Sequence, residues 1–357
     1  MLFLFWACSQ ATTTQIDYEP PWLKYDITAT GPFSVGHMQY THEYTPIENQ
    51  PLRSIVIDIW YPTTDTSGEE GEYLYGVDAL VFEDASIAES VYEDGYPIHL
   101  HSHGYRGWGA TSSSLMRHFA SHGWVSISPN HTNNLLGDHE SPLAVAHYIH
   151  RALDLQESIS VLENIEGFSS TQSNNVLMSG HSFGAGYSSW SVAGAEFTQA
   201  DIFCDTGVGL EDESIRCTET EKDMFLSDEL HDPRVKAIIP MAGTIRQSFF
   251  GDNGHQNVDL PILFLSGTED GHESAQAHWG AMNELDFRWL SLEGGCHQTF
   301  ALGQCSTLDV DLGFSIVSSY ALTFARHNIL QDETSTILDW LDGHTQPYTQ
   351  ATIHVSP

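Results

Sequence analysis

Positive charge is what this sequence has least of. Only 12 of its 357 residues are Lys or Arg, against 48 Asp and Glu, so the formal net charge is -36 at pH 7. Such an acidic surface repels the phosphates of nucleic acids and anionic membranes, and we expect no nucleic-acid partner. The acidic excess fits either a strongly solvated surface or a salty habitat, where counter-ions screen the self-repulsion.

Long hydrophobic runs are also absent. No stretch approaches the roughly 20 apolar residues that cross a bilayer. Internal repeats are missing, which argues against a structural adhesin. The hydrophobic content of 41% is nevertheless enough for a sizeable core and argues against a disordered chain.

Cysteine is scarce, and its first occurrence lies near the N-terminus. Residues 2–7 are apolar, and Cys8 follows the small residue Ala7. This pattern resembles the cleavage box of bacterial lipoproteins, although the apolar run is short and no Lys or Arg precedes it. Residues 1–30 are therefore interpreted as a signal-like segment and linker, with a membrane tether through lipidated Cys8; a frayed terminus is the alternative. The protein would then be secreted, periplasmic or at the cell surface.

The other four cysteines lie close together in two pairs. Cys204 and Cys217 flank an acidic segment, and Cys296 and Cys305 flank a short loop. In an exported protein both pairs could form local disulfides. Free thiols are the alternative, and the spacing alone leaves both open.

Strand-like and helix-like segments alternate along most of the chain. Residues 54–62 alternate like a half-buried strand, and the acidic residues 63–95 are expected outside the core. Further strands are predicted at 97–104, 124–130, 175–180, 235–243, 261–270 and 287–295, and helices at 112–123, 142–165, 182–195 and 312–342. This alternation predicts an α/β fold, a mainly parallel sheet with helices on both faces. Its ligand site should lie at the carboxyl ends of the strands.

One acidic segment interrupts the alternation. Residues 197–232 separate the helix at 182–195 from the strand at 235–243. We interpret them as an inserted cap or lid in a domain that spans 31–345. A surface loop without a role in the site is the alternative.

The motif GHSFG at residues 180–184 follows a predicted strand and opens a predicted helix. A nucleophile at the tip of a sharp strand-to-helix turn needs small residues two positions to either side, because the turn is crowded. Gly180 and Gly184 meet this requirement. The motif therefore predicts Ser182 as a nucleophile and the α/β-hydrolase fold.

A serine hydroxyl needs a base, and in this fold the acid and then the histidine follow the serine in the chain. Asp270 comes at the end of the predicted strand 261–270, with Glu269 as the fallback, and His297 lies in the Gly-rich loop after the strand 287–295. His297 is the predicted base, and Asp270 is predicted to hold its tautomer. Turn-forming and surface roles are the alternatives for these two residues.

An ester hydrolase also needs two N–H donors for the oxyanion. We expect one from Phe183, directly after the nucleophile, and one from Tyr105, after the turn at His103-Gly104. The aromatic residues Trp108 and Trp190, together with Phe183 and Trp279, are candidates for the walls of the substrate site. Core packing is the alternative for these side chains.

Three histidines, His99, His101 and His103, alternate along one predicted strand and share a face. Three histidines on one face could indicate zinc. A serine hydrolase needs no metal or other cofactor, so we expect none, and polar packing is the simpler interpretation.

Several motifs together resemble one group of proteins. IVIDIWYP, HSHGYRG, GHSFGAG, GTED and GCH, with the helical segment HRALDLQESISVLEN, are similar to the platelet-activating-factor acetylhydrolases and predicted dienelactone hydrolases. The resemblance covers residues 50–330. It implies an α/β hydrolase with Ser182 as nucleophile, His297 as base, and Tyr105 and Phe183 as oxyanion donors.

The resemblance also bears on the acid and on the substrate. Some members of the group place the acid one strand earlier, but residues 235–244 offer no carboxylate, so Asp270 is the prediction. Dienelactone hydrolases use a Cys nucleophile, and Ser182 stands there in this chain. Polyester hydrolases share the architecture.

These features predict a monomeric serine esterase that acts on small or lipid-like esters through an acyl-enzyme. A Cys296–Cys305 bridge would stiffen the loop that carries the base. The alternatives are a cutinase-like polyester hydrolase and, from another class, an inactive ligand-binding surface lipoprotein.

Overall fold

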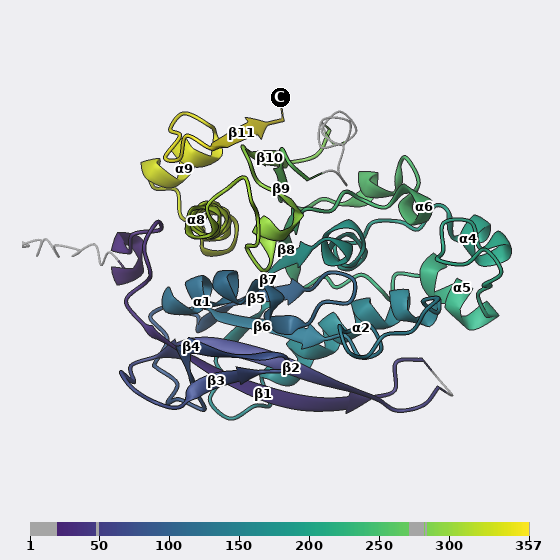
Figure 1. The fold of residues 1–357 in the computed structure, drawn as a ribbon, viewed down its shortest axis with the longest axis horizontal. Coiled ribbons are helices and arrows are strands. Elements are labelled where there is room, and N and C mark those ends of the chain that lie inside the picture. The colour runs from purple at the N-terminus through teal and green to yellow at the C-terminus, as the bar shows by residue number, and fades with distance from the viewer. Residues whose placement is uncertain (1–19, 48–49, 271–281, 283, 357) are drawn as a thin grey trace, which may run out of the picture.

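One mixed β-sheet organises the part of the chain that the structure describes. The structure is a computed structural model that describes residues 20–47, 50–270, 282 and 284–356. Within these residues the sheet has 11 strands in the order β11-β10-β9-β8-β7-β5-β6-β2-β1-β4-β3 (Figure 1). The strands are β1 (Ser34–Tyr44), β2 (Arg53–Thr63), β3 (Glu70–Tyr73), β4 (Gly76–Glu83), β5 (Tyr96–Ser102), β6 (Val125–Asn130), β7 (Thr171–His181), β8 (Val235–Met241), β9 (Ile262–Gly267), β10 (Phe287–Leu292) and β11 (Ala351–Val355).

The middle of the sheet is parallel and its edges include antiparallel pairs. Strands β6, β5, β7, β8, β9 and β10 run in the same direction. Strand β2 pairs with β6, and β11 with β10, in the opposite direction. Parallel strands are covered on both faces, so their residues are buried on both sides. Strand β7 follows this rule, because every residue from Val176 to His181 is buried.

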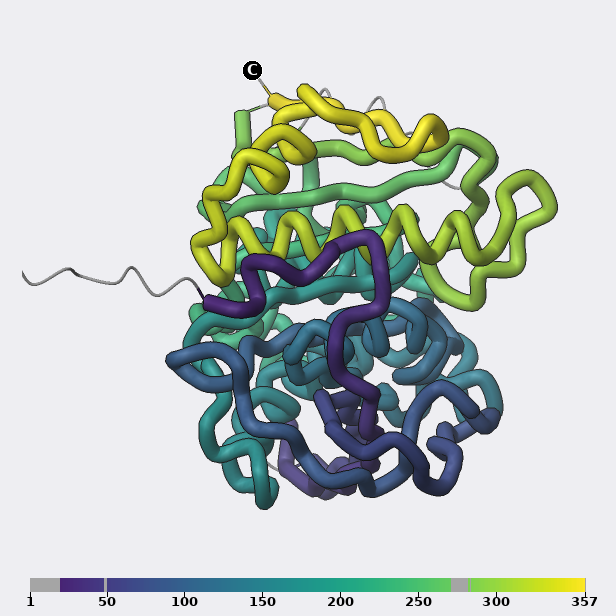
Figure 2. Tube along the Cα trace, turned by 90° about the vertical axis from the view of Figure 1, so that its left-hand side faces the viewer, coloured from purple at the N-terminus to yellow at the C-terminus, as the bar shows by residue number. Residues whose placement is uncertain are grey.

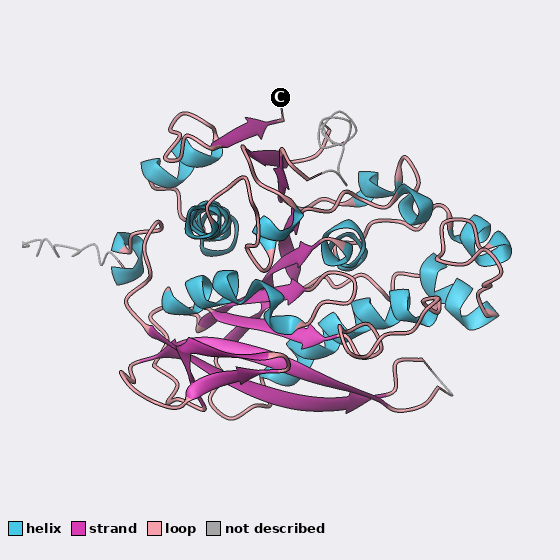
Figure 3. Cartoon of the chain, viewed as in Figure 1, coloured by secondary structure: helices cyan, strands magenta, loops and turns pink. Residues whose placement is uncertain are grey.

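Helices pack on both faces of this sheet (Figure 3). Helices α1, α8 and α9 cover one face, and α2 to α6 lie on the other (Figure 1). Each face has its own hydrophobic cluster, and β7 contributes Val176 and Met178 to one cluster and Leu177 to the other. The predicted α/β arrangement is therefore confirmed. The helices are α1 (Ser113–Ser121), α2 (Ala146–Leu162), α3 (Ser189–Val192), α4 (Ala200–Thr206), α5 (Glu219–Leu226), α6 (Gln247–Phe250), α8 (Val310–Leu330) and α9 (Ser335–Leu341).

The chain before β1 packs against α8. Figure 2 shows residues 20–30 lying across this helix, and Arg326 donates hydrogen bonds of 3.2 Å to the backbone carbonyls of Leu23 and Tyr25. The described part of the segment interpreted as a linker is thus held on the domain. The apolar run and Cys8 lie outside the described residues.

Residues 63–95 differ from the expectation. They form two largely exposed strands, β3 and β4, and β4 extends the sheet at its edge by pairing in parallel with β1. Their composition misleads because these edge strands expose Val77 and Leu80 and carry Asp78, whose carboxylate pairs with Arg117. Acidic edge strands have the composition of a loop.

Two further strands show the limits of the sequence pattern. Strand β2 was expected to be half-buried, but Asp58 and Trp60, on the face opposite to Ile57, are buried as well. Helices cover both sides of this part of the sheet. Strand β11 follows residue 345, where the domain was expected to end, and pairs with β10.

The cysteine pairs have different outcomes. Cys204 and Cys217 form a disulfide that joins α4 to the start of α5. Cys296 and Cys305 are free, so the predicted bridge between them is wrong. The two thiols lie within hydrogen-bond reach of each other; Cys296 Sγ also donates to the Gln304 carbonyl at 3.6 Å, and Cys305 Sγ lies 3.2 Å from Thr307 Oγ1. No helix in the described residues is both long enough and apolar enough to cross a membrane.

Candidate active site

Ser182 stands at the tip of a tight turn between β7 and a short helix. Its φ of +54° is in the left-handed region, which non-glycine residues seldom occupy outside strained functional turns. The turn is held from both sides, because Ser182 N donates to the Met241 carbonyl at 2.9 Å and Gly186 N donates to the Ser182 carbonyl at 2.8 Å. The hydroxyl is therefore presented beyond the carboxyl end of the strand.

The two glycines of the motif allow close backbone contacts. A Cβ atom on Gly180 would lie 2.4 Å from the carbonyl carbon of Gly184, and one on Gly184 would lie 2.0 Å from the Ser102 carbonyl oxygen. Both distances are far below van der Waals contact. The helix expected over 182–195 is shorter than predicted: a π-helical turn at Gly184–Ser188 continues into α3.

The predicted acid and base meet at the carboxyl ends of β9 and β10. Nδ1 of His297 lies 2.9 Å from Oδ2 of Asp270. The Asp270 side chain is fully buried, whereas the His297 side chain is 24% exposed. Glu269, the fallback acid, is exposed, and its backbone N–H donates to the Gly295 carbonyl at 2.8 Å, which joins the two loops. Asp270 is thus the carboxylate that contacts the imidazole.

A second histidine supports the loop of His297. His181, which precedes the serine, lies with Nε2 at 3.0 Å from the His297 backbone carbonyl, and the two rings are 4.8 Å apart. Burial lowers the pKa of His181 to about 4, so the ring is neutral at pH 7. The neutral ring fixes the backbone of the predicted base without adding charge.

Ser182 and His297 line the same cavity, which has a volume of about 320 Å³. Its floor comes from the turns after β7 and β8. The lining residues are Ser182, Gly186, Ala242, Gly243, Thr244, Arg246 and His297. The cavity lies at the carboxyl ends of the parallel strands, where the sequence predicted a ligand site.

The loop predicted to supply the second oxyanion donor passes beside the serine. A Cβ atom on Gly104 would lie 3.3 Å from Cβ of Ser182. The next side chain, Tyr105, donates its hydroxyl to Glu211 Oε1 at 2.7 Å. Glu211 belongs to the 197–232 segment, so this segment contacts the loop that borders the site. The guanidinium of Arg151 donates to the His103 carbonyl and holds the other end of the loop.

Phe183, the other predicted donor, has its ring in contact with two cations. The guanidinium carbons of Arg151 and Arg246 each lie 4.6 Å from the ring centroid. The Phe183 side chain is only 2% exposed, so it belongs to the core and forms no wall of the cavity. Its backbone N–H, not its ring, remains the candidate contribution to the site.

The predicted tryptophan walls do not line the cavity. Trp190 is fully buried in the cluster on the α2 face, because α3 packs it against the sheet. Trp108 is half-buried, and its ring lies 5.2 Å from that of Tyr75. The expectation for Trp190 and Trp108 therefore receives no support from the cavity, and Trp279 lies outside the described residues.

The early histidines contact polar groups in the interior of the domain. His99 Nε2 and His101 Nδ1 lie 2.7 and 2.8 Å from the hydroxyl of Ser179. Burial lowers the pKa of His99 to about 3, so it is neutral at pH 7. Across the described ranges, no group of three His, Cys, Asp or Glu side chains is arranged to hold a metal ion.

A buried polar network beneath the site was missed by the sequence analysis. Ser102 Oγ lies 3.0 Å from His131 Nε2, and His131 Nδ1 lies 2.8 Å from Asp154 Oδ2. Burial opposes ionisation of Asp154, but Arg53, at 2.7 Å, holds the pKa of this carboxyl well below its usual range. No short motif indicates these residues, because three separate strands and a helix bring them together.

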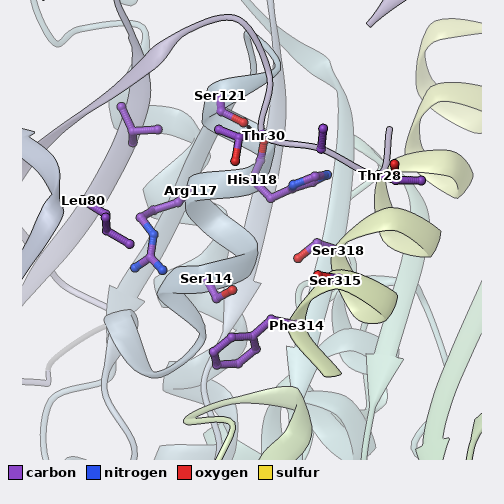
Figure 4. Close-up of a pocket in the computed structure, with 12 residues that line it drawn as sticks. Thr28, Thr30, Leu80, Ser114, Arg117, His118, Ser121, Phe314, Ser315 and Ser318 are labelled. Atoms are coloured by element: carbon purple, nitrogen blue, oxygen red, sulfur yellow. Dashed lines mark hydrogen bonds between the residues drawn. The ribbon is translucent and has the colours of Figure 1, made fainter. Parts of the chain in front are cut away.

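A second cavity lies away from the predicted catalytic residues. It has a volume of about 310 Å³ between α1, α8 and the segment at 28–30 (Figure 4). His118 and Arg117 line it together with several Ser and Thr hydroxyls. Ser182, Asp270 and His297 do not belong to its lining, so the cavity of Ser182 is the candidate active site.

Comparisons with known proteins agree with this architecture. No family model matches the chain, and no curated protein matches it in sequence. Among solved structures, the chain is similar to a ferulic acid esterase from Streptomyces cinnamoneus, with a TM-score of 0.60 and 18% sequence identity over 90% of this chain and 96% of that chain. Together with the strand order, this likeness identifies the α/β-hydrolase fold that the sequence predicted.

Proposed function

We propose that the protein is a serine carboxylic ester hydrolase whose catalytic residues are Ser182, His297 and Asp270. The observation that supports this most is the 2.9 Å contact of His297 with the buried Asp270, in a cavity that His297 shares with Ser182. A base that is oriented by a carboxylate and faces a strained serine turn is the arrangement that activates a hydroxyl.

The proposed reaction has two halves. His297 takes the proton of Ser182 Oγ as this oxygen attacks the ester carbonyl, and a tetrahedral intermediate forms. Its oxyanion accepts hydrogen bonds from the N–H groups of Phe183 and Tyr105. When the intermediate collapses, the bond to the alcohol breaks, the alcohol receives the proton from His297, and the acyl group stays on Ser182.

Water completes the cycle. His297 takes a proton from the water that attacks the acyl-enzyme, and the second collapse returns that proton to Ser182 Oγ and releases the acid. Asp270 holds the Nδ1–H tautomer of His297 and stabilises the imidazolium that forms in each half. These steps use only groups of this chain and water.

The substrate class is part of the proposal. We infer small or lipid-like carboxylic esters, in keeping with the resemblance to platelet-activating-factor acetylhydrolases and predicted dienelactone hydrolases. The name of the structural neighbour, ferulic acid esterase, adds an aromatic acyl ester to the substrates worth testing. A polyester is the alternative substrate, and release of soluble products from a polyester film would support it.

We also propose that the protein is an exported monomer. The Cys204–Cys217 disulfide supports export, because such bonds persist mainly in oxidising compartments. A lipid tether at Cys8 and the absence of nucleic-acid partners remain part of this proposal. Mass spectrometry of the protein from a native membrane fraction would detect an acylated Cys8.

The test is hydrolysis of p-nitrophenyl esters from acetate to palmitate by the wild type and by Ser182→Ala. We expect turnover in the wild type and a loss of at least about 10³-fold in the variant, because no other nucleophile replaces the serine. The chain-length profile would narrow the acyl group. A folded wild type that neither turns over any ester nor reacts with a fluorophosphonate probe would favour the inactive binding protein instead.

A further inference from the structure

Within the described residues, the cavity of Ser182 holds a cation that has no carboxylate partner. Arg246 follows β8, is half-buried, and lines this cavity together with Ser182 and His297. Its backbone N–H donates to the Gly186 carbonyl at 2.9 Å, which fixes the residue on the serine turn. Its guanidinium stacks on Phe183 at 4.6 Å and, within the described residues, makes no ion pair or hydrogen bond. Its N–H donors therefore remain available to a ligand.

A shortage of acids does not explain this lack of a partner. The chain has 48 Asp and Glu against 12 Lys and Arg. Five other arginines in the described residues have carboxylate partners within 4 Å, in the pairs Arg53–Asp154, Arg117–Asp78, Arg234–Asp232, Arg288–Asp286 and Arg326–Asp332. In a molecule of this composition, a cavity cation without a carboxylate is available to bind an anion.

The surroundings of Arg246 strengthen the positive potential there. Arg151 also stacks on the Phe183 ring, at 4.6 Å from the ring centroid, and although burial lowers its pKa to about 9, it remains a cation at pH 7. The nearby Glu211 carboxylate is already engaged, because it accepts from the Tyr105 hydroxyl and from the Leu143 N–H. Two cations therefore contact the same ring, and the carboxylate of Glu211 binds other donors than Arg246.

We propose that Arg246 binds a carboxylate carried by the substrate, so that the enzyme prefers esters with a free carboxylate to neutral esters of the same size. This inference rests on the proposed ester hydrolysis and names its substrate class. A guanidinium matches a carboxylate with two parallel N–H donors, and its stacking on an aromatic ring orients it for this contact. A net charge of -36 repels anions at long range, so a carboxylate-bearing substrate needs such a cation in the site.

The experiment compares matched pairs of esters. 4-Nitrophenyl hemiglutarate carries the carboxylate on the acyl side, and 4-nitrophenyl pentanoate is its neutral counterpart. 4-Butyryloxybenzoate carries it on the alcohol side, with its methyl ester as the neutral counterpart. The quantity measured is the ratio of kcat/KM for the anionic ester to that for the neutral ester. The pair whose ratio changes when Arg246 is replaced shows whether the carboxylate is bound on the acyl or on the alcohol side of the ester.

We expect Arg246→Gln to lower this ratio by about 10-fold or more for one pair, since a charge-assisted hydrogen bond is lost. Arg246→Lys should keep part of the preference, because the charge remains without the fork. Arg216→Gln is the matched control: it removes one positive charge from the exposed part of the inserted segment, away from the cavity lining, and should leave the ratio unchanged. An equal ratio in wild type and Arg246→Gln for both pairs would falsify the proposal and leave Arg246 as a packing group on Phe183.

A binding measurement separates this inference from the proposed chemistry. Calorimetry with monomethyl glutarate on Ser182→Ala needs no turnover, and we expect binding that Arg246→Gln in the same background weakens about 10-fold or more. Binding without ester turnover in the wild type would overturn the proposed hydrolysis and keep the anion site. Turnover of neutral esters, without binding or substrate preference that depends on Arg246, would overturn the anion site and keep the proposed hydrolysis.

Discussion

At the scale of single residues, the candidate site depends on which of two adjacent carboxylates reaches the imidazole. Glu269 and Asp270 both follow β9, but Asp270 is buried with its Oδ2 at 2.9 Å from His297, and Glu269 is exposed. The reason lies in the backbone, because the Glu269 N–H is bound to the loop of His297 and this directs its side chain outward. The two residues therefore form a matched pair for mutation.

We predict that Asp270→Asn lowers kcat by about 10⁴-fold with little change in stability. The amide keeps the shape of the side chain, but it can no longer hold the tautomer of His297 in which Nε2 accepts the proton of Ser182. The measurement is kcat for the best p-nitrophenyl ester, with a thermal melt of each variant. Glu269→Gln should behave like the wild type, and equal losses in both variants would contradict the assignment of the acid.

The sequence predicted the reacting residues because they belong to short motifs in a fixed order. Ser182 is marked by its glycines, and Asp270 and His297 by strand ends and Gly-rich turns. Arg246 could not be found in this way, since its place in the cavity depends on how the turn after β8 meets Phe183. The prediction that Trp190 lines the substrate site was not supported for the same reason, because the packing of α3 decides the burial of this side chain.

At the scale of elements, the central strands were predictable and the edges were not. Strand β7 is apolar on both faces from Val176 to Met178, and this signal does not depend on its neighbours. Strands β3, β4 and β11 are edge or near-edge elements with mixed polarity, and they become strands only through pairing with β1 and β10. Their pattern alone is that of acidic or polar loops.

The inserted segment at 197–232 is closed by its own crosslink. The Cys204–Cys217 disulfide joins α4 to the start of α5, and Glu211 between them reaches Tyr105 beside the site. A crosslink that closes a loop with a sequence separation of 13 residues restricts the unfolded chain and contributes about 3 kcal/mol to the free energy of unfolding. The bond thus stabilises the segment that borders the proposed oxyanion loop.

We predict that replacing both Cys204 and Cys217 by Ala lowers the free energy of unfolding by about 2–3 kcal/mol, measured by urea denaturation. Dithiothreitol should lower the stability of the wild type to a similar extent and leave the double variant unchanged. This second arm tests Cys296 and Cys305 as well, because they are free thiols in the structure. A double variant that reductant still destabilises would show that they form a bridge in solution.

At the scale of the whole molecule, two kinds of ionisable group oppose each other. The acidic surface gives the net charge of -36, and the interior holds histidines that burial keeps neutral. Burial lowers the pKa of His99, His118 and His131 to about 3. His37 is the opposite case: although burial opposes its charge, Asp58 and Glu83 raise its pKa to about 9.

The sign of the pH dependence follows from these shifts. A histidine in the unfolded chain has a pKa near 6.5, so it becomes protonated as the pH falls below this value. The buried rings stay neutral in the folded state until about pH 3, so between these values the unfolded state binds more protons. Each such ring lowers the free energy of unfolding by about 1.4 kcal/mol per pH unit in this window. His37 stabilises the fold fully below pH 6.5, and this contribution is lost as the pH rises towards 9. Stability should therefore be greatest near pH 7.

We predict a loss of several kcal/mol in the free energy of unfolding between pH 7 and pH 5, measured by urea denaturation in about 1 M NaCl, which screens the changing surface charge. His118 allows a matched test, because its Nε2 is buried and has no hydrogen-bond partner among the residues that the structure describes, so its removal breaks no described bond at that atom. His118→Leu should reduce the slope with pH by about one proton, whereas the exposed His344→Gln should leave the slope unchanged. Equal stability at pH 7 and pH 5 would mean that the buried histidines gain their protons without unfolding the chain.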